Sequence, residues 1–379
     1  MIDIFEICPS PESAQVPWDT INEQYSWIRD LKGCPQNPKY HAEGDVWVHT
    51  RMVCEAMVRL EAWAGLSQPL REDLFAAALL HDAAKPECTK VQANGRITSR
   101  GHARRGALKA RRLLWRAGVD LERRERICSL VRHHMVPLYL RDSEHRDRQV
   151  LTISQGLRCD LLAILGIADA QGRICDDPED LLIRHQAFES ICRSWNCFDK
   201  PFVFSSEATR FQYFQHLLDD PKGEAEAPRS EVVLMSGLPG VGKRRWVERH
   251  LDGFERLDLD ELRRDMEVPW RDNQGAVISE ARSRAREFLS QGRAFVWIDM
   301  NLSRQLRDHL VRLFAEMGAR VRIVYVEGRP EDVRRELECS PLGSVEDLDH
   351  LLDHWEKPDS SEAHLLEQIL PQVLVEMTV

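Results

Sequence analysis

The sequence predicts a two-domain protein in which an all-α helical bundle precedes an α/β domain built on a parallel sheet. Over about the first two hundred residues, apolar side chains recur at spacings of three and four, as on one face of a helix. A polar segment with Pro and Gly follows at residues 219–230. Beyond it, short β-rich runs alternate with helical stretches, which is typical of parallel sheets. We therefore expect a helical domain over 1–215, a linker over 216–230 and an α/β domain over 231–379.

The individual elements follow from the same periodicities. The apolar spacing predicts helices over 46–64, 71–84, 102–116, 121–134 and 159–170. The β-rich runs predict parallel strands over 231–236, 255–258, 294–299 and 321–326.

Composition limits the class of protein. A chain of 379 residues is long enough for both domains to bury a core of their own. It holds no apolar run of membrane-spanning length and no basic flank before an apolar stretch at its N-terminus. We therefore expect a cytoplasmic protein that does not bind membranes. Its ten cysteines show no paired CxxC spacing of the zinc type, so we expect buried free thiols rather than a metal or disulfide framework.

The net charge of −10 argues against a general nucleic-acid coat, but the charge is unevenly placed. Between Arg96 and Arg132 there are twelve Lys or Arg residues and three Asp or Glu residues. Such a stripe is suited to following a phosphate backbone, and it is equally consistent with a solvated helix face. The overall acidity indicates that any nucleic acid is held locally, at an end.

A first candidate site lies at residues 79–85, where His81 and Asp82 are adjacent. On the expected helix these two side chains diverge by about 100° and touch different sides of a metal centre. Lys85 then lies one turn beyond His81, where an ammonium group can meet a substrate phosphate. A His-Asp dipeptide alone is common by chance, so the interpretation depends on further ligands.

Those ligands occur in order along the helical half. The candidates that join His81 and Asp82 are His49, His102, His134 and Asp169. Each histidine alone is also explained by a core or capping role. Asp169 lies in an apolar helical run, where burying a carboxylate costs several kcal/mol unless something such as a metal compensates. We prefer His134 to His133 because it better matches the helical face of Leu130 and Val131.

This order of residues resembles the HD superfamily of metallo-phosphohydrolases. The stretch over 36–50 (QNPKYHAEGDVWVHT) further resembles the HD domains attached to bacterial CCA-adding enzymes, which act on 2′,3′-cyclic phosphates. The resemblance implies that His49, His81, Asp82 and Asp169 hold one metal, and that His102 and His134 help to hold a second, with Asp82 bridging. It implies that Lys85, and Arg104 or Arg105, neutralise developing charge. One or two ions of Mn, Co, Ni, Fe or Zn suit this set.

A second candidate site is a phosphate-binding P-loop. A β-rich run leads into GLPGVGK, which carries Gly237, Gly240, Gly242 and Lys243, and a helical stretch follows. Backbone amides of such a loop cradle the β-phosphate of ATP or another nucleoside triphosphate, and Lys243 bridges the β- and γ-phosphates. Arg244 stands where the motif places a hydroxyl on Mg²⁺, and an arginine cannot ligate that ion. Either other groups and water hold Mg²⁺, or the kinase activity is reduced or lost.

The second half resembles the 5′-hydroxyl polynucleotide kinases. Asp260 and Arg263 fit the Asp-x-x-Arg motif of that family, which implies a general base for the 5′-OH and a ligand for the neighbouring phosphate. Asp260 as the N-cap of the next helix is compatible with the same pattern. Asp299 and Arg304 lie in a segment similar to the family's Asp-Thr-Asn stretch, and we assign both to substrate binding.

The lid helix of that family should bring arginines onto the phosphates. Arg335 is our catalytic candidate there, with Arg329 and Arg334 also available. The segment over 336–341 is shorter than in the family and lacks its further arginine. The C-terminal stretch over 355–364 resembles bacterial members.

The order of the two modules resembles the bacterial bifunctional end-healing enzymes, HD-Pnk. That resemblance implies conversion of RNA or DNA ends with a 2′,3′-cyclic, 2′- or 3′-phosphate and a 5′-OH into 3′-OH and 5′-phosphate ends, which a polynucleotide ligase of the same pathway then seals. Two alternatives remain. In one, the P-loop domain senses a nucleotide or RNA end without phosphorylating it; in the other, the chain is a nucleotide-pool phosphohydrolase, against which the stretch over 36–50 counts.

Overall fold

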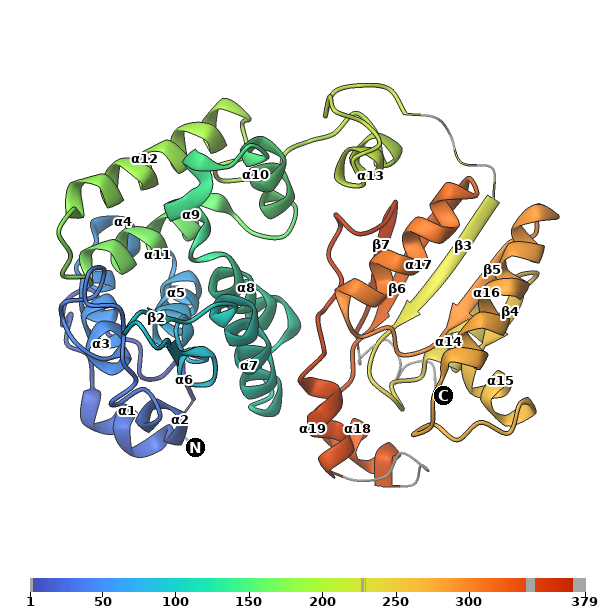
Figure 1. The fold of residues 1–379 in the computed structure, drawn as a ribbon, viewed down its shortest axis with the longest axis horizontal. Coiled ribbons are helices and arrows are strands. Elements are labelled where there is room, and N and C mark those ends of the chain that lie inside the picture. The colour runs from blue at the N-terminus through green and yellow to red at the C-terminus, as the bar shows by residue number, and fades with distance from the viewer. Residues whose placement is uncertain (1–2, 226–227, 229, 339–344, 371–379) are drawn as a thin grey trace. The chain divides into compact units, whose positions relative to one another are not determined.

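The computed structural model describes residues 3–225, 228, 230–338 and 345–370. The chain divides into two compact units between Phe202 and Val203 (Figure 1). As the sequence predicts, the first unit is helical and the second is an α/β domain with a parallel sheet.

The N-terminal unit is a bundle in which α3, α5, α8 and α11 pack on one another. Its helices are α1 (Trp18–Gln24), α2 (Ser26–Arg29), α3 (Val46–Met57), α4 (Glu61–Ala64), α5 (Gln68–Leu80), α6 (Lys85–Cys88), α7 (His102–Arg116), α8 (Leu121–His133), α9 (Val136–Tyr139), η1 (Leu140–Asp142), α10 (Arg146–Ser154), α11 (Cys159–Gln171) and α12 (Pro178–Ser194). A two-stranded antiparallel ribbon joins β1 (Lys90–Val91) to β2 (Ile97–Thr98). Helix α11 is apolar almost all round because α3, α5 and α12 cover it.

Two expected helices end earlier than their apolar spacing suggests. The helix expected over 46–64 is divided into α3 and α4. The helix expected over 71–84 was wrong at its C-terminal end, because α5 stops at Leu80 and His81 is its C-cap. Pro86 gives the reason: in a continuing helix it could donate no hydrogen bond and its ring would clash with the carbonyl of Asp82. His81 and Asp82 therefore lie in a turn, and Lys85 begins α6 rather than lying one turn along the same helix.

The C-terminal unit contains a five-stranded parallel sheet with strand order β4-β5-β3-β6-β7 (Figure 1). Its strands are β3 (Ser230–Ser236), β4 (Glu255–Asp258), β5 (Phe295–Ile298), β6 (Ala319–Val326) and β7 (Leu365–Ile369). Its helices are α13 (Glu207–Phe214), α14 (Lys243–His250), α15 (Leu259–Asp265), α16 (Gly275–Ser290), α17 (Arg304–Glu316), α18 (Pro330–Glu338) and α19 (Val345–Leu352). The four expected strands are confirmed within two residues at each end, and β7 was not expected.

Helix α13 is part of the C-terminal unit, although the sequence placed residues 203–215 in the helical domain. Phe211 lies in the hydrophobic core beside the sheet and stacks on His364, with ring centroids 3.8 Å apart. Arg210 donates a hydrogen bond of 2.6 Å to the backbone carbonyl of His364. The sequence signal for this element is weak because α13 has only eight residues, and its partner in the core lies far along the chain.

Within the described ranges, no individual helix has both the length and the apolar character needed to cross a bilayer. Helices α10 and α11 meet those criteria only when taken together, and a bend of 112° separates them.

Candidate functional site

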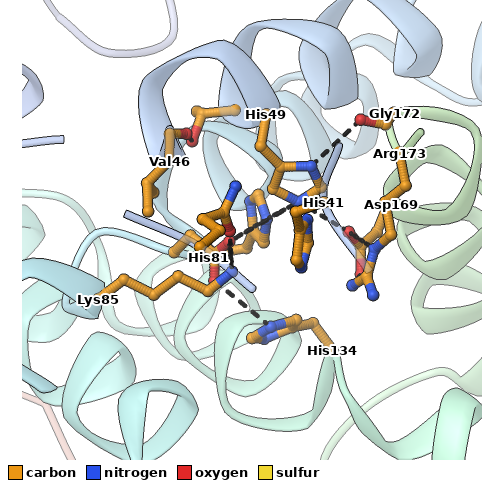
Figure 2. A network of polar contacts seen from close by, with 12 residues as sticks. His41, Val46, His49, His81, Lys85, His134, Asp169, Gly172 and Arg173 are labelled. Carbon is orange, nitrogen blue, oxygen red and sulfur yellow. Dashed lines mark hydrogen bonds and ion pairs between the residues drawn. The ribbon is translucent and has the colours of Figure 1, made fainter. Parts of the chain in front are cut away.

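The six metal-ligand candidates come from five parts of the N-terminal unit and meet in its interior. His49 lies on α3, His81 and Asp82 follow α5, His102 begins α7, His134 caps α8 and Asp169 lies near the end of α11. Figure 2 shows how His49, His81, His134 and Asp169 converge from these elements.

Asp82 belongs to two groups of ligand atoms at once. Its Oδ2 lies 3.2 Å from His81 Nε2 and 3.7 Å from His49 Nε2. Its Oδ1 lies 3.3 Å from His102 Nε2 and 3.9 Å from His134 Nε2. In each group the candidate donor atoms lie within 4.8 Å of one another. The geometry therefore fits two ions that share one carboxylate.

Asp169 joins the group that contains His49. Its Oδ1 lies 3.0 Å from His49 Nε2, and its other oxygen lies 2.5 Å from Arg173 Nη2. Arg173 follows Asp169 by four residues at the end of α11 and was not among our candidates. The i, i+4 spacing of opposite charges is the signal that could have found it.

All four histidines are held by hydrogen bonds to backbone carbonyls. The acceptors of their Nδ1 atoms are the carbonyls of Gly172 for His49, Ala78 for His81, Ser99 for His102 and Val131 for His134, at 3.1, 2.7, 2.7 and 2.8 Å. A carbonyl oxygen can only accept, so each Nδ1 carries a proton. In the neutral ring, Nε2 then carries a lone pair that is available to a metal. The hydrogen bond from Nδ1 to the carbonyl also fixes the orientation of the ring.

The pair His102 and His134 indicates that a cation belongs between them. Burial lowers the pKa of His134 to about 3 and also lowers that of His102, so both rings are neutral near pH 7. Their Nε2 lone pairs nevertheless face each other at 3.2 Å. Asp82 Oδ1 is buried without a hydrogen-bond partner among the described residues, whereas Oδ2 forms an ion pair with Lys85. This nitrogen and oxygen donor set fits a divalent transition metal.

In the ligand group that contains His49, His81 and Asp82, the negative charge of the carboxylates is balanced by protons and by cationic side chains. Burial alone would raise the pKa of Asp82, yet the charges of His81 and Lys85 hold that pKa well below its usual range. Burial likewise would lower the pKa of His49, but hydrogen bonds to Asp169 and Glu43 raise it overall. A metal ion at His49 would take the place of the proton on Nε2.

The stretch over 36–50 forms one wall of the centre. Glu43 Oε1 lies 3.0 Å from His49 Nδ1 and 2.8 Å from His41 Nδ1. Lys85 Nζ donates a hydrogen bond of 2.6 Å to Gln36 Oε1 and lies 2.7 Å from Asp82 Oδ2. Lys85 therefore binds the bridging carboxylate directly.

The two arginine candidates after His102 lie on the exposed face of α7. Arg104 and Arg105 are both exposed, and Arg105 Nε donates to Glu87 Oε2 at 3.1 Å. Other members of the basic stripe are also paired within the unit: Lys109 with Glu87, Arg111 with Glu125, and Arg123 and Arg126 with Asp73. Much of the stripe's charge is therefore neutralised by acidic side chains.

The P-loop connects β3 to α14 and depends on glycines at three points. Gly237 has φ +146°, and a Cβ there would lie 2.4 Å from the carbonyl oxygen of Val326. Gly242 has φ +85° and is the N-cap of α14. A Cβ on Gly240 would lie 2.4 Å from Cβ of Glu336, so α18 packs directly on the loop. These positions require glycine because the backbone is left-handed and approached closely.

Lys243 turns back into its own loop. Its Nζ donates to the carbonyls of Gly237 and Leu238 at 2.8 and 2.7 Å. Burial lowers the pKa of Lys243 to about 8, against the opposing effect of Asp299. A bound phosphate would compete with these carbonyls for the ammonium group.

Arg244 is the centre of a charged cluster at the carboxyl ends of β3, β4 and β5. Its guanidinium pairs with Asp258, and its Nη2 donates to Asp260 Oδ2 at 2.9 Å. Arg263 Nη1 donates to the other oxygen of Asp260, and Arg263 Nη2 lies 3.4 Å from Asp299 Oδ1. Both oxygens of Asp260 are thus occupied by guanidinium groups.

Asp258, and not Asp260, caps α15. The Asp258 side chain accepts hydrogen bonds from the backbone N–H groups of Asp260 and Glu261. The capping role that the sequence allowed for Asp260 was therefore wrong, because β4 ends at Asp258 and α15 already begins at Leu259, which places Asp260 in the first turn of the helix. Asp260 remains about half exposed.

The segment after β5 is fixed to the start of the P-loop. Asn301 has φ +47° and donates from Nδ2 to the Met235 carbonyl at 2.7 Å, while the Gly237 N–H donates to Met300 at 2.9 Å. Burial raises the pKa of the neighbouring Asp299, with Arg263 opposing. These contacts hold Asp299 beside the loop that binds phosphate.

Arg304 and Arg335 have contacts of other kinds. Arg304 Nη1 lies 2.5 Å from Asp359, and its Nη2 donates to Ser361 at 2.8 Å, so Arg304 is held by the C-terminal stretch over 355–364. Arg335 lies on α18, is largely exposed and pairs with Asp332 at 2.7 Å. The expected shortening over 336–341 falls partly outside the described residues.

Comparison with known proteins assigns both halves. Residues 46–160 match the family model of the HD domain, and residues 232–338 match that of the AAA domain. No curated protein matches the chain. The chain therefore joins an HD phosphohydrolase domain to a P-loop kinase-like domain, a combination that supports an enzyme with phosphoesterase- or kinase-type activity.

Proposed function

We propose that this chain heals broken nucleic-acid ends. Its HD domain would remove 2′,3′-cyclic, 2′- or 3′-phosphates in a metal-dependent reaction, and its P-loop domain would transfer phosphate from ATP with Mg²⁺ to a 5′-OH. The observation that carries the proposal is the pair of ligand groups that share Asp82. A phosphate-removing centre and a phosphate-transferring loop in one chain suit a substrate with two ends that need opposite treatment.

The HD half would use its residues in the roles that their contacts support. His49, His81, Asp82 and Asp169 would hold one ion, and His102 and His134 with Asp82 the other. Bound metal ions lower the pKa of water and polarise phosphoryl oxygens. The carbonyl-bound imidazoles keep the site rigid, and Lys85 supplies positive charge beside the bridging carboxylate.

The stretch over 36–50 supports a cyclic-phosphate substrate. Its resemblance to the HD domains of CCA-adding enzymes is supported by its contacts with the candidate metal site. Gln36 accepts a hydrogen bond from Lys85, and Glu43 contacts both His41 and His49. A substrate phosphate at the ligand groups would lie against this wall. A free mononucleotide would use the same centre; the resemblance and the presence of the second domain support a polynucleotide end instead.

In the P-loop half, Lys243 would bind the β- and γ-phosphates of ATP and Arg263 a phosphate of the nucleic acid. Asp260 would accept the proton of the 5′-OH. For that step at least one of its guanidinium partners has to move away, because both carboxylate oxygens are occupied. Arg335 on α18 would approach the phosphates from the lid, and Asp299 and Arg304 would border the acceptor strand.

A second function is favoured by one observation. Arg244 ties together Asp258 and Asp260 at the position where a metal-binding hydroxyl is expected. With that cluster intact, the P-loop domain would bind a nucleotide or an RNA end and leave the 5′-OH unphosphorylated. Only the HD domain would then be catalytic.

The test supplies RNA with 5′-OH and 2′,3′-cyclic phosphate ends, ATP and a panel of Mn²⁺, Co²⁺, Ni²⁺, Fe²⁺, Zn²⁺ and Mg²⁺. Wild type, Asp82→Ala and Lys243→Ala are compared with matched controls at exposed positions, Asp142→Ala and Arg245→Ala. We expect Asp82→Ala to lose 3′ healing alone and Lys243→Ala to lose 5′ phosphorylation alone. The same ends on DNA test the nucleic-acid preference.

The other outcomes are equally informative. If wild type phosphorylates no 5′ end with any metal, the kinase assignment is wrong and the sensor function remains. If free nucleotides are hydrolysed and RNA ends are not, the chain is a nucleotide-pool phosphohydrolase.

A further inference from the structure

Three cysteines meet in the interior of the N-terminal unit. Cys159 is the first residue of α11, Cys192 lies in the last turns of α12, and Cys197 follows that helix. Their sulfur atoms lie within 4.8 Å of one another, and none of the three residues is exposed. They share no residue with the ligand groups around Asp82.

The end of α12 brings two of the three together. Asn196 has φ +51°, and the Cys197 N–H donates to the Cys192 carbonyl at 2.9 Å. This is the six-to-one hydrogen bond of a Schellman motif, in which the side chains at these two positions meet. The Asp160 N–H in turn donates to the Phe198 carbonyl at 2.8 Å, which places the start of α11 beside the same turn.

Apolar packing alone explains two facing side chains in such a motif, but it does not call for a third cysteine from another helix. Cys159, at the start of α11, brings its sulfur atom to the same point as Cys192 and Cys197, and all three residues are fully buried. Three buried sulfur atoms that converge from two helices and a turn form a ligand set that soft and borderline metal ions bind.

We propose that Cys159, Cys192 and Cys197 bind a thiophilic metal ion of the zinc class. Three sulfur ligands without a carboxylate select soft or borderline ions, whereas the nitrogen and oxygen ligands around Asp82 accept harder ones. A divalent ion replaces the thiol protons, which leave to solvent as the metal–sulfur bonds form. The N-terminal end of α11 adds a favourable partial positive charge for the remaining negative charge of the thiolates.

The ion would connect α12 to α11, the helix that carries Asp169 of the other metal centre. Cys159 and Asp169 lie on the same helix, ten residues or about 15 Å apart. A metal at Cys159 would fasten the start of α11 to the end of α12, and its binding free energy would add to the stability of this packing. The role is structural, because all three ligands are fully buried.

The experiment titrates reduced, chelator-stripped full-length protein with Cd²⁺ and follows thiolate-to-metal charge-transfer absorption. An Asp82→Asn background weakens the other centre, whose nitrogen and oxygen ligands give no thiolate absorption. We expect one equivalent of Cd²⁺ per chain to produce the absorption and to protect three thiols from a thiol reagent. Zn²⁺ should compete for the same site, and Mn²⁺ should not.

Single substitutions identify the ligands. Cys159→Ser, Cys192→Ser and Cys197→Ser should each weaken Cd²⁺ binding at least roughly tenfold. Cys54→Ser and Cys128→Ser are matched controls, since both residues are equally buried and lie outside the cluster; they should bind like the parent. If the parent protein shows no thiolate absorption with Cd²⁺, or if protein purified without reductant holds a Cys192–Cys197 disulfide and no metal, the proposal is wrong, whether or not the variants fold.

Discussion

Arg244 determines which chemistry is open to the P-loop domain. A guanidinium group cannot ligate Mg²⁺, and this one also pairs with Asp258 and Asp260. It therefore replaces an expected hydroxyl and at the same time covers the candidate general base. Both side chains of the Arg244–Asp260 pair are about half exposed, so its contribution to stability is small, at most about 1 kcal/mol.

Replacing Arg244 by threonine should raise 5′-kinase turnover at least roughly tenfold, which corresponds to about 1.4 kcal/mol of added transition-state stabilisation. The new hydroxyl could ligate Mg²⁺, and Asp260 would lose one of its two guanidinium partners. A steady-state assay with labelled ATP and 5′-OH RNA measures the change. Arg245→Thr is the control, because Arg245 is the exposed neighbour and its substitution should leave turnover unchanged. Equal turnover in Arg244→Thr would contradict the prediction, and lower turnover would show that Arg244 supports catalysis.

Lys243 should make nucleotide affinity dependent on pH. Its pKa in the free protein is lowered to about 8, whereas bound phosphates favour the charged ammonium group. Below pH 8 the ammonium is already charged and the affinity should be flat. Above pH 8 binding requires uptake of a proton, so the Kd for ATP should rise by up to about tenfold per pH unit. Calorimetry between pH 6.5 and about 9.5 would test this, and a flat profile would contradict it.

The variant Lys243→Arg is the control for that titration. An arginine stays charged throughout this range, so its nucleotide affinity should not change with pH. The same reasoning applies to stability without nucleotide: the lowered pKa disfavours the charged form in the folded state, so the free energy of unfolding should increase as pH rises from about 8 toward the ordinary lysine value.

The convergence of the candidate metal ligands could be predicted from the sequence, and their supporting contacts could not. His49, His81, Asp82 and the remaining three ligands are residue types that metals bind, in an order that a family shares. Glu43 contacts His49 through a backbone turn that no periodicity predicts. The cysteine cluster was missed because Cys159 and Cys192 come from different helices, and only the turn at Asn196 adds Cys197.

Among the secondary-structure elements, α11 is packed closely against its neighbours. Its apolar surface is covered on several sides, so small residues occur where neighbours approach most closely. A Cβ on Gly166 would lie 2.3 Å from the ring of His185, and one on Gly172 would lie 2.7 Å from the backbone nitrogen of Val53 on α3. The Gly172 carbonyl also accepts the hydrogen bond that orients His49. The C-terminal end of α11 thus sets the distance between Asp169 and His49.

Substituting Gly172 by alanine should push α11 away from α3. The added methyl group meets backbone, which cannot rotate away, so we expect a loss of about 1–3 kcal/mol in unfolding free energy. Since His49 loses its fixed carbonyl partner, Mn²⁺ affinity should fall roughly tenfold. Denaturant unfolding and Mn²⁺ titration measure the two effects.

Gly156→Ala is the matched control for this substitution, because nothing lies within 4 Å of a Cβ at that position. It should change neither quantity measurably. Normal Mn²⁺ affinity in Gly172→Ala would mean that the ligand spacing does not depend on this contact.

Apolar periodicity predicted the ends of helices less well than it predicted the strands. Apolar spacing continues from α5 through Ala83 and Ala84, so it indicates one helix where the chain forms a helix and a turn. Only the backbone chemistry of Pro86 reveals the break. The strands were easier, because buried parallel strands are short apolar runs bounded by turns.

On the scale of the whole molecule, the chain consists of two units with separate cores and separate family matches. The helical and α/β classes could be predicted from the change in periodicity near residue 230. The position of α13 could not, because its membership depends on Phe211 reaching the sheet core and stacking on His364.

Fragments should show where the second unit begins. We expect residues 203–379 to unfold cooperatively on their own. Residues 216–379 should be less stable by about 3–5 kcal/mol or fail to fold, because they lack the buried ring of Phe211. Phe211→Ala in the full chain should lower the stability of this unit by a similar amount. Equal stability of the two fragments would place the boundary after α13.

The carbonyls that orient His81 and His134 lie in the last turns of α5 and α8, where carbonyl groups lack partners within the helix. Each of these imidazoles therefore also serves as the C-terminal cap of its helix. An alanine at either position removes a ligand and frays a helix end together, so lost activity would mix two causes. Glutamine or asparagine, which can still donate to the carbonyl, would separate ligation from capping.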